Sequence, residues 1–276
     1  MTTQLKTLYD SIDPEIIETV ETRSAEIANG ASASSKVMAA LALGSVPIAL
    51  GVLSKEAYGQ APPDVVDVLQ FALLLEFLEA EFYNRGVAAA GLIPAEDRAI
   101  FTTIMAHENV HVSTLQGLIT GKGAAPAPKP TFDYTGKGLL PGFNFGATQY
   151  ATFLALSQAF EDTGVRAYKG QAGRLINDKP ILTAALTIHS VEARHASEVR
   201  RLRGKKGWIT QNSRDDLPLF TQAVYQEEDT FTQAGLNLVP LGNGNGGSNA
   251  VTEAFDEPLT KQQVTFIVNP FIVGAP

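Results

Sequence analysis

The sequence of 276 residues contains no cysteine, and this absence excludes several kinds of site. Without thiols the chain has no disulfide, no cysteine nucleophile, no thiolate zinc site and no iron–sulfur or rubredoxin-like centre. Any metal ion must therefore bind to nitrogen and oxygen ligands. Histidine is also scarce, with four in the chain, so the position of each histidine is informative.

Basic residues are too few for a nucleic-acid-binding surface. Lysine and arginine together number 21 against 29 acidic residues, which gives a net charge of -8. No RNA- or DNA-binding motif is present, so nucleic acid is excluded as a main partner. The composition, 45% hydrophobic and 18% charged, is ordinary for a folded chain with a sizeable core.

The N-terminal part, residues 1–61, is predicted to be helical and to include an apolar segment, residues 37–53. At 17 residues with a proline inside it, this segment is shorter than the roughly 20 residues of a membrane-spanning helix. The 36 residues before it exceed the length of a whole signal peptide, about 15 to 30 residues. A buried or interface helix is favoured, while an export signal and a membrane anchor stay open.

Hydrophobic periodicity predicts a bundle of four helices over residues 62–203. The helices are expected at 63–90, 95–119, 147–172 and 180–203 and form two hairpins with short turns. Residues 120–146 between the hairpins are rich in glycine and proline and long enough to return along the bundle. We therefore expect an all-α fold with a long central crossover.

After residue 203 the chain becomes polar, with scattered aromatic side chains. We expect a loop over 241–250 and a short last helix whose capping box is formed by Thr260 and Gln263. Residues 204–276 are predicted to form a tail that packs on the bundle, because a separate domain of that size would have little core of its own.

Glutamate, tyrosine and histidine recur at the same spacing in the two predicted hairpins. In each hairpin the first helix has a glutamate seven residues before a tyrosine, and the second has a glutamate three residues before a histidine. Matching residues of the two hairpins are 84 or 85 positions apart. The residues are Glu76, Tyr83, Glu108 and His111 in the first hairpin and Glu161, Tyr168, Glu192 and His195 in the second.

This spacing is typical of a centre for two metal ions. Antiparallel pairing brings Glu76 and Glu108 to the same height, and a glutamate and a histidine three residues apart share a helix face. Four carboxylates and two imidazoles suit two divalent ions of iron or manganese, with Glu76 and Glu161 bridging or capping them. The two tyrosines lie on the same face and can donate hydrogen bonds to ligand carboxylates. The alternative is a polar core without metal.

On these motifs, over residues 62–203, the sequence resembles the ferritin-like superfamily, and within it the ferritin-like domain proteins that include desiccation- and stress-related members. The resemblance implies a four-helix bundle and a set of six metal ligands. Many bacterial relatives carry a twin-arginine export signal, whereas here Arg23 lies alone between Thr22 and Ser24. Cytoplasm and cell envelope both stay open as locations. The implied ligands are Glu76, Glu108, His111, Glu161, Glu192 and His195.

Three further residues are weaker candidates. His189 is one turn before Glu192 and is a candidate for contact with a ligand, although an ordinary core position is the alternative. His107 is expected on another helix face, in a surface or packing role. Glu79 is one turn after Glu76 and could be an alternate ligand, but a solvated or salt-bridged position is favoured.

The resemblance also implies redox chemistry with peroxide or dioxygen, either catalase-like or ferroxidase-like, in protection against stress. One rival hypothesis is a non-catalytic protein in which metal ions stabilise the bundle. The other is an assembly subunit that uses residues 37–53 as its contact. Homo-oligomerisation and membrane association stay open.

Overall fold

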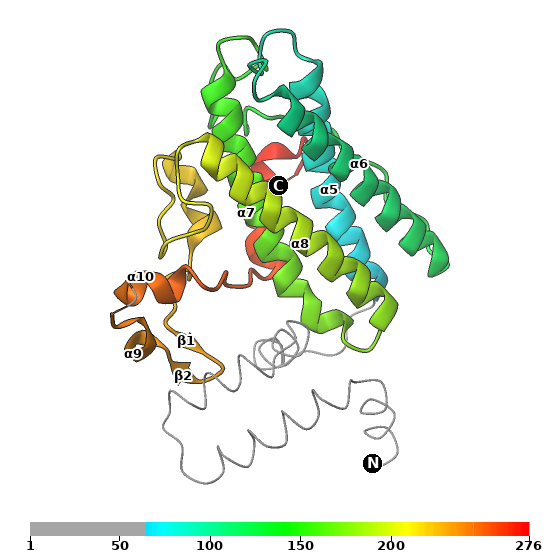
Figure 1. Ribbon diagram of the computed structural model, residues 1–276. Helices are drawn as coiled ribbons and strands as arrows, with labels where there is room; N and C mark the ends of the chain where they lie inside the picture. Colours follow the sequence, from blue (N-terminus) through cyan, green and yellow to red (C-terminus); the bar gives the residue numbers. More distant parts are fainter. Residues whose placement is uncertain (1–64, 245, 276) are drawn as a thin grey trace.

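The computed structural model describes residues 65–244 and 246–275. The predicted N-terminal helices and the apolar segment 37–53 lie outside these residues. Four long helices form the body of the molecule (Figure 1). They are α5 (Val65–Ala88), α6 (Arg98–Gly121), α7 (Tyr150–Ala172) and α8 (Lys179–Leu202). The all-α bundle expected from the sequence is thus confirmed.

Local sequence signals account for the helix starts. Asp178 caps α8, because its side chain accepts a hydrogen bond from the backbone nitrogen of Ile181. Helix α6 begins at Arg98, three residues later than expected, after turns at residues 94–97. Its N-cap residue, Asp97, makes no side-chain cap, and its carboxylate instead accepts a hydrogen bond of 2.5 Å from Tyr150 at the start of α7.

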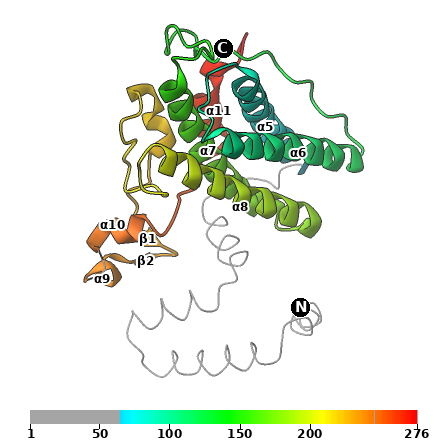
Figure 2. The ribbon, with the colours of Figure 1, turned by 45° about the horizontal axis from the view of Figure 1, so that its top comes forward.

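The four helices pack as two antiparallel hairpins, α5 with α6 and α7 with α8. Figure 2 shows the chain between α6 and α7 running from the far end of α6 back along the bundle to the start of α7. This crossover packs on the first helix, where the Tyr134 hydroxyl donates to the Leu78 carbonyl oxygen at 2.7 Å. Aromatic rings from three segments meet there: Phe82 stacks on Phe153 with ring centroids 4.7 Å apart, and the Phe145 ring is tilted against Phe82 at 5.5 Å.

The chain after α8 contains several short elements. In order along the chain they are η2 (Leu219–Tyr225), β1 (Thr232–Gln233), β2 (Leu236–Asn237), α9 (Val239–Gly242), α10 (Gly247–Thr252), α11 (Lys261–Val268) and η3 (Asn269–Phe271), whereas η1 (Gly173–Leu175) follows α7. The capping box predicted for the last helix is present in α11.

Two features of this segment differ from the sequence-based expectation. Strands β1 and β2 form a small antiparallel hairpin. Its two turn residues, Ala234 and Gly235, have positive φ angles of 50° and 77°, as a tight two-residue hairpin turn requires. The loop expected over 241–250 is shorter than predicted, because α9 extends to Gly242 and α10 begins at Gly247.

A buried arginine joins the C-terminal segment to the bundle. Arg166 of α7 is fully buried and forms an ion pair with Glu228 at 2.6 Å. Its guanidinium also donates to the carbonyl oxygens of Val224, Gln226 and Glu257. One side chain thus satisfies three backbone groups and one carboxylate of the segment that wraps α7.

Glycine allows a close approach of the same segment to α7 one turn further on. A Cβ atom at Gly170 would lie 1.9 Å from the Leu259 carbonyl oxygen, too close for any other residue without movement of the backbone. Leu259 also donates its backbone N–H to the Arg166 carbonyl oxygen at 3.1 Å. The segment is therefore fitted to the backbone of α7 as well as to its side chains.

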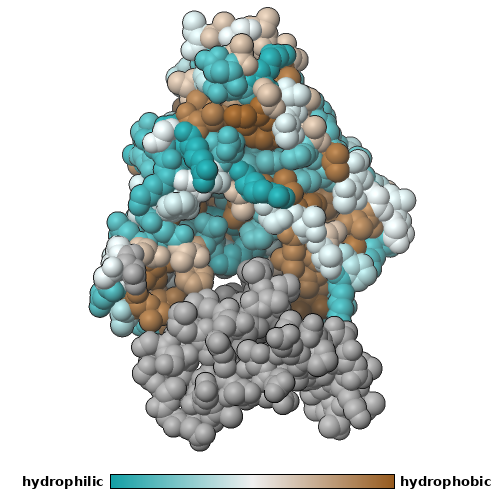
Figure 3. All heavy atoms as spheres, in the orientation of Figure 1, coloured by the Kyte–Doolittle hydropathy of each residue, from teal (hydrophilic) through white to brown (hydrophobic). Residues whose placement is uncertain are grey.

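On the face shown in Figure 3, hydrophilic side chains cover most of the middle of the bundle and hydrophobic ones form separate areas near its ends. The largest exposed hydrophobic side chains are scattered; Leu219 and Phe266 are the most exposed. Among the described residues, none of the helices has the length and apolar character needed to cross a membrane.

Candidate metal centre

The six residues singled out by the doubled pattern converge in the middle of the bundle. Glu76 comes from α5 and Glu161 from α7, while each Glu-x-x-His pair comes from α6 or α8. The four glutamates have no exposed surface, and the two histidines are 5–6% exposed. The structure brings together Glu76, Glu108, His111, Glu161, Glu192 and His195 in two overlapping groups.

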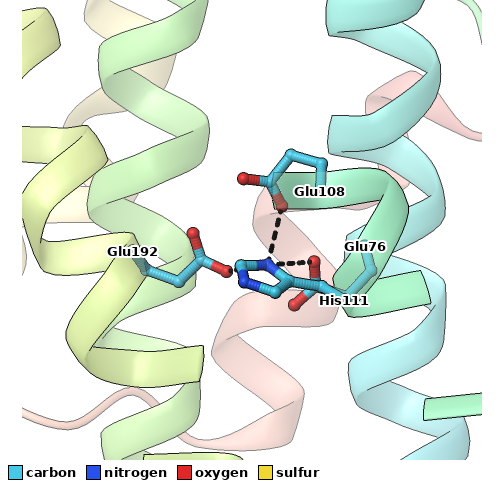
Figure 4. A group of neighbouring side chains, drawn as sticks. All are labelled: Glu76, Glu108, His111 and Glu192. Atoms are coloured by element: carbon cyan, nitrogen blue, oxygen red, sulfur yellow. Dashed lines mark hydrogen bonds and ion pairs between the residues drawn. The ribbon is translucent and has the colours of Figure 1, made fainter. Parts of the chain in front are cut away.

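The first group lies around the Nδ1 atom of His111 (Figure 4). Three carboxylates from three helices point toward this atom. The distances are 3.2 Å to Glu76 Oε2, 3.1 Å to Glu108 Oε2 and 3.0 Å to Glu192 Oε1.

The second group has the same form around the Nδ1 atom of His195. The distances are 2.8 Å to Glu108 Oε1, 3.4 Å to Glu161 Oε2 and 3.2 Å to Glu192 Oε2. Glu161 here takes the place that Glu76 has in the first group. The 84- and 85-residue repeat of the sequence therefore corresponds to a repeat in space.

Glu108 and Glu192 belong to both groups, with one carboxylate oxygen of each toward His111 and the other toward His195. The sequence suggested that Glu76 and Glu161 bridge or cap. In the structure each of these two residues belongs to one group only, so they occupy capping positions. The carboxylates placed to bridge are those of the Glu-x-x-His pairs, because α6 and α8 lie next to each other and each carries its glutamate toward both histidines.

Hydrogen bonding alone does not account for this arrangement. A single Nδ1 hydrogen cannot be donated to three carboxylate oxygens at once. Three buried oxygens, Glu108 Oε1, Glu161 Oε2 and Glu192 Oε1, have no hydrogen-bond partner among the residues that the structure describes, although each is within 3.4 Å of a histidine nitrogen. Buried carboxylates without donors are costly. A cation in each group would satisfy these oxygens, so the residues fit two metal ions with nitrogen and oxygen ligands.

Burial and mutual repulsion dominate the charge state of the centre without metal. Burial, and after it the charge of Glu192, raises the pKa of Glu76 well above its usual range. Burial likewise raises the pKa of Glu161 to about 8. Burial opposes the ionised form of Glu108 as well, but its close contacts with His111 and His195 outweigh that effect and lower its pKa to about 2. Protonation of Glu76 and Glu161 thus reduces the repulsion among the clustered carboxylates.

The two tyrosines donate to the capping carboxylates across the bundle. The Tyr83 hydroxyl lies 2.5 Å from Glu161 Oε1, and the Tyr168 hydroxyl donates to Glu76 Oε1. Each tyrosine therefore holds the glutamate of the other hairpin. Burial, and after it the adjacent glutamate charge, raises the pKa of both hydroxyls, so both stay protonated as donors.

Removing these donors should weaken metal binding. We expect Tyr83→Phe and Tyr168→Phe each to raise the dissociation constant for Fe(II) or Mn(II) by about 10- to 100-fold, because each leaves a ligand carboxylate without its orienting hydrogen bond. Titration of the protein freed of metal measures this. Tyr150→Phe is the matched control, since it removes a hydroxyl–carboxylate bond to Asp97 outside the centre. Equal constants for all four proteins would show that the tyrosines do not orient ligands.

The weaker candidates lie in places that the sequence did not resolve. His189 is partly buried, and its Nδ1 atom has no hydrogen-bond partner among the described residues. His107 is exposed, yet its Nδ1 lies 2.9 Å from Nε2 of His195, and the two rings stack at 5.2 Å. The surface or packing role expected for His107 agrees with this position, but its contact with a residue of the centre was not expected. This contact could have been predicted from the sequence, because His107 is four residues before His111 and the two therefore lie on one side of α6.

Glu79 also differs from the favoured expectation of a solvated or salt-bridged side chain. It is 3% exposed and has no hydrogen bond or ion pair with any residue that the structure describes. Its pKa is raised well above the usual range by burial and then by the charges of Glu192 and Glu161. The carboxyl group is therefore part of the surroundings of the centre.

Comparison with known families agrees with this geometry. A family model described as a ferritin-like domain matches residues 64–205, which include all four long helices and all six converging residues. A comparison with curated proteins gave no match.

Proposed function

Because the chain belongs to the ferritin-like domain family, we propose that it holds two divalent metal ions, iron or manganese, and uses them in redox chemistry with dioxygen or peroxide. The resemblance to desiccation- and stress-related members suggests protection against oxidative stress as its role. Both parts of the proposal depend on the buried centre between the two hairpins.

One observation carries the proposal: two histidine nitrogens each face three buried carboxylate oxygens, and Glu108 and Glu192 take part in both sets. Shared carboxylates suit two ions held a few ångströms apart, roughly 3.5–4 Å in two-metal sites. Four carboxylates carry the charge that two divalent cations neutralise. The donor atoms are hard oxygens and imidazole nitrogens, which iron and manganese accept.

The residues have separable parts in this function. Bound ions would bind and polarise the oxidant and exchange electrons with it. Glu108 and Glu192 would each bind both ions, and Glu76 and Glu161 would each bind one of them. Tyr83 and Tyr168 hold these capping carboxylates in place. The surrounding core of the bundle excludes bulk water from the carboxylates.

The source of electrons narrows the reaction class. The chain has no cysteine and so no built-in rubredoxin-like donor. A peroxidase of the kind that draws on such a donor would need one from another protein. A catalase-like reaction takes electrons from peroxide itself, and a ferroxidase-like reaction takes them from Fe(II). We therefore propose one of these two reactions.

Elemental analysis of the purified protein, together with its optical spectrum, tests the proposal first. We expect two iron or manganese ions per chain in the wild type and none in Glu108→Gln/Glu192→Gln. Peroxide consumption and Fe(II) oxidation are then measured on both proteins. Two bound ions without turnover of either substrate would favour a non-catalytic protein stabilised by metal. A wild type that takes up no metal would refute the centre itself.

A further inference from the structure

Glu79 is a buried carboxyl group that the six-residue set does not use. It lies on α5, one turn after Glu76, and 3% of its surface is exposed. No described residue gives it a hydrogen bond or a positive partner. The groups that act on it electrostatically are the four glutamates of the centre, with Glu192 and Glu161 first. Burial without a positive partner is costly for the ionised form of a carboxyl group, and a cation at the centre would offset that cost.

The space for Glu79 comes from a glycine on the facing helix. A Cβ atom at Gly164 of α7 would lie 3.3 Å from Glu79 Oε1 and 3.7 Å from Glu192 Cγ. The missing side chain therefore lets the carboxyl of Glu79 lie beside Glu192 at the centre.

Glu79 and Gly164 are related by the same sequence repeat as the residues of the centre. Gly164 is 85 residues after Glu79, which is the offset between Glu76 and Glu161. The two hairpins thus place Glu79 and Gly164 at equivalent positions, and one carries a carboxyl group while the other carries no side chain. The centre is asymmetric at this point, with a single additional carboxylate.

The number of ligands leaves room for that carboxylate. Each group in the structure contributes four donor residues. Manganese with oxygen ligands commonly takes six ligands in octahedral geometry. The Glu79 oxygens are outside the two close groups, but the carboxyl lies against Gly164, one turn from Glu161 of the second group.

We propose that Glu79 is a fifth carboxylate ligand of the centre, available to the ion held by Glu161 and His195, and that the missing side chain at Gly164 leaves room for it. This inference rests on the proposed function, because it assumes that the centre binds metal. It makes the two metal positions unequal: the ion at His195 has one protein ligand more than the ion at His111.

Metal titration of variants tests this proposal without any assay of turnover. The free Mn(II) concentration is followed by electron paramagnetic resonance, and the Co(II)-loaded protein is examined by visible absorption, which reports the coordination of the ion. The variants are Glu79→Gln and Gly164→Ala. The matched control is Glu81→Gln, which removes a carboxylate on the same helix whose ion pair with Lys129 is partly exposed.

We expect Glu79→Gln to weaken the binding of one of the two ions by at least about 10-fold and to change the Co(II) spectrum. Gly164→Ala should shift the same spectrum although it removes no polar atom, and Glu81→Gln should match the wild type. Neither main variant should prevent folding, because glutamine has nearly the same shape as a protonated glutamate and alanine is favourable within a helix.

The outcomes separate the two proposals. If the wild type binds two ions and Glu79→Gln gives the same constants and spectrum, Glu79 is not a ligand and the inference is overturned while the proposed function stands. If the wild type binds no ion, the proposed function is refuted and this inference with it. If Glu79→Gln binds one of the two ions more weakly than the wild type does, the result supports both the proposed function and this inference.

Discussion

Removal of metal from the protein is expected to lower its melting temperature, and by more at pH 8 than at pH 5. Each ion bound at about 100 times its dissociation constant adds about 2.7 kcal/mol to the free energy of unfolding. For a chain of this size 1 kcal/mol corresponds to about 2–4 °C. Two ions should therefore raise the melting temperature by roughly 10–20 °C.

The pH dependence follows from the carboxyl groups that lose their cations. A carboxyl with a raised pKa binds its proton more tightly in the folded state, so its contribution to stability falls as pH rises from the unfolded pKa to the folded one. For Glu161 this window extends from 4.5 to about 8. The pKa of His195 is raised from 6.5 to about 12, against the effect of burial, by the charge of Glu161 and by its close contact with Glu108, and this shift acts in the same direction above pH 6.5.

Glu108 acts in the opposite direction, since its pKa is lowered, but only below pH 4.5. The metal-free protein should therefore be more stable at pH 5 than at pH 8. Metal binding needs deprotonated ligands and becomes stronger as pH rises. Calorimetric melts of chelated and reloaded protein at both pH values measure the difference. Glu108→Gln/Glu192→Gln should melt at the same temperature with and without metal. A wild type that behaves like this variant would exclude metal as a stabilising element.

The second large effect is expected from Arg166→Ala. The change removes an arginine with no exposed surface, leaving Glu228 buried without its cation and three backbone carbonyl oxygens without their donor. Breaking a buried ion pair on one side costs about 3–5 kcal/mol. The melting temperature should fall by roughly 6–20 °C, and the C-terminal segment should become sensitive to protease.

Two further variants show how much of the loss in Arg166→Ala comes from burial of the ion pair and from the unpaired charge of Glu228. Arg174→Ala removes a partly exposed arginine whose ion pair with Asp67 spans 3.5 Å, and it should cost less than about 1 kcal/mol. Arg166→Met/Glu228→Gln should be more stable than Arg166→Ala, because the carboxylate that loses its partner becomes a neutral amide. Equal losses for Arg166→Ala and Arg174→Ala would mean that the buried pair does not attach the segment.

The sequence predicted the centre because its geometry is helical and periodic. Glu108 and His111 share a face of one helix whatever surrounds them, and hairpin pairing brings that face to the height of Glu76. The four long helices were predicted with ends within three residues of those observed. Both predictions depend on the spacing of residues along single helices, which can be read directly from the sequence.

What the sequence did not predict depends on contacts between elements. The favoured expectation for Glu79 was a solvated or paired side chain, because the space that buries it is created by Gly164 on another helix. The contact of His107 with His195 joins residues 88 positions apart and depends on how α6 meets α8. The contacts of Arg166 were not predicted, because its partners lie in a segment without hydrophobic periodicity. The division of the chain into an N-terminal part, a bundle and a tail stays a prediction.

The pairing of the helices also bears on how fast the protein unfolds. Most of the contacts between the long helices lie within the α5–α6 and α7–α8 hairpins, so each hairpin can form from residues close in sequence. Each ligand set, in contrast, draws on both hairpins and is complete only after they have docked. Interactions absent from the transition state change the unfolding rate rather than the folding rate. Bound metal would thus slow the separation of the docked hairpins and lower the unfolding rate of the protein.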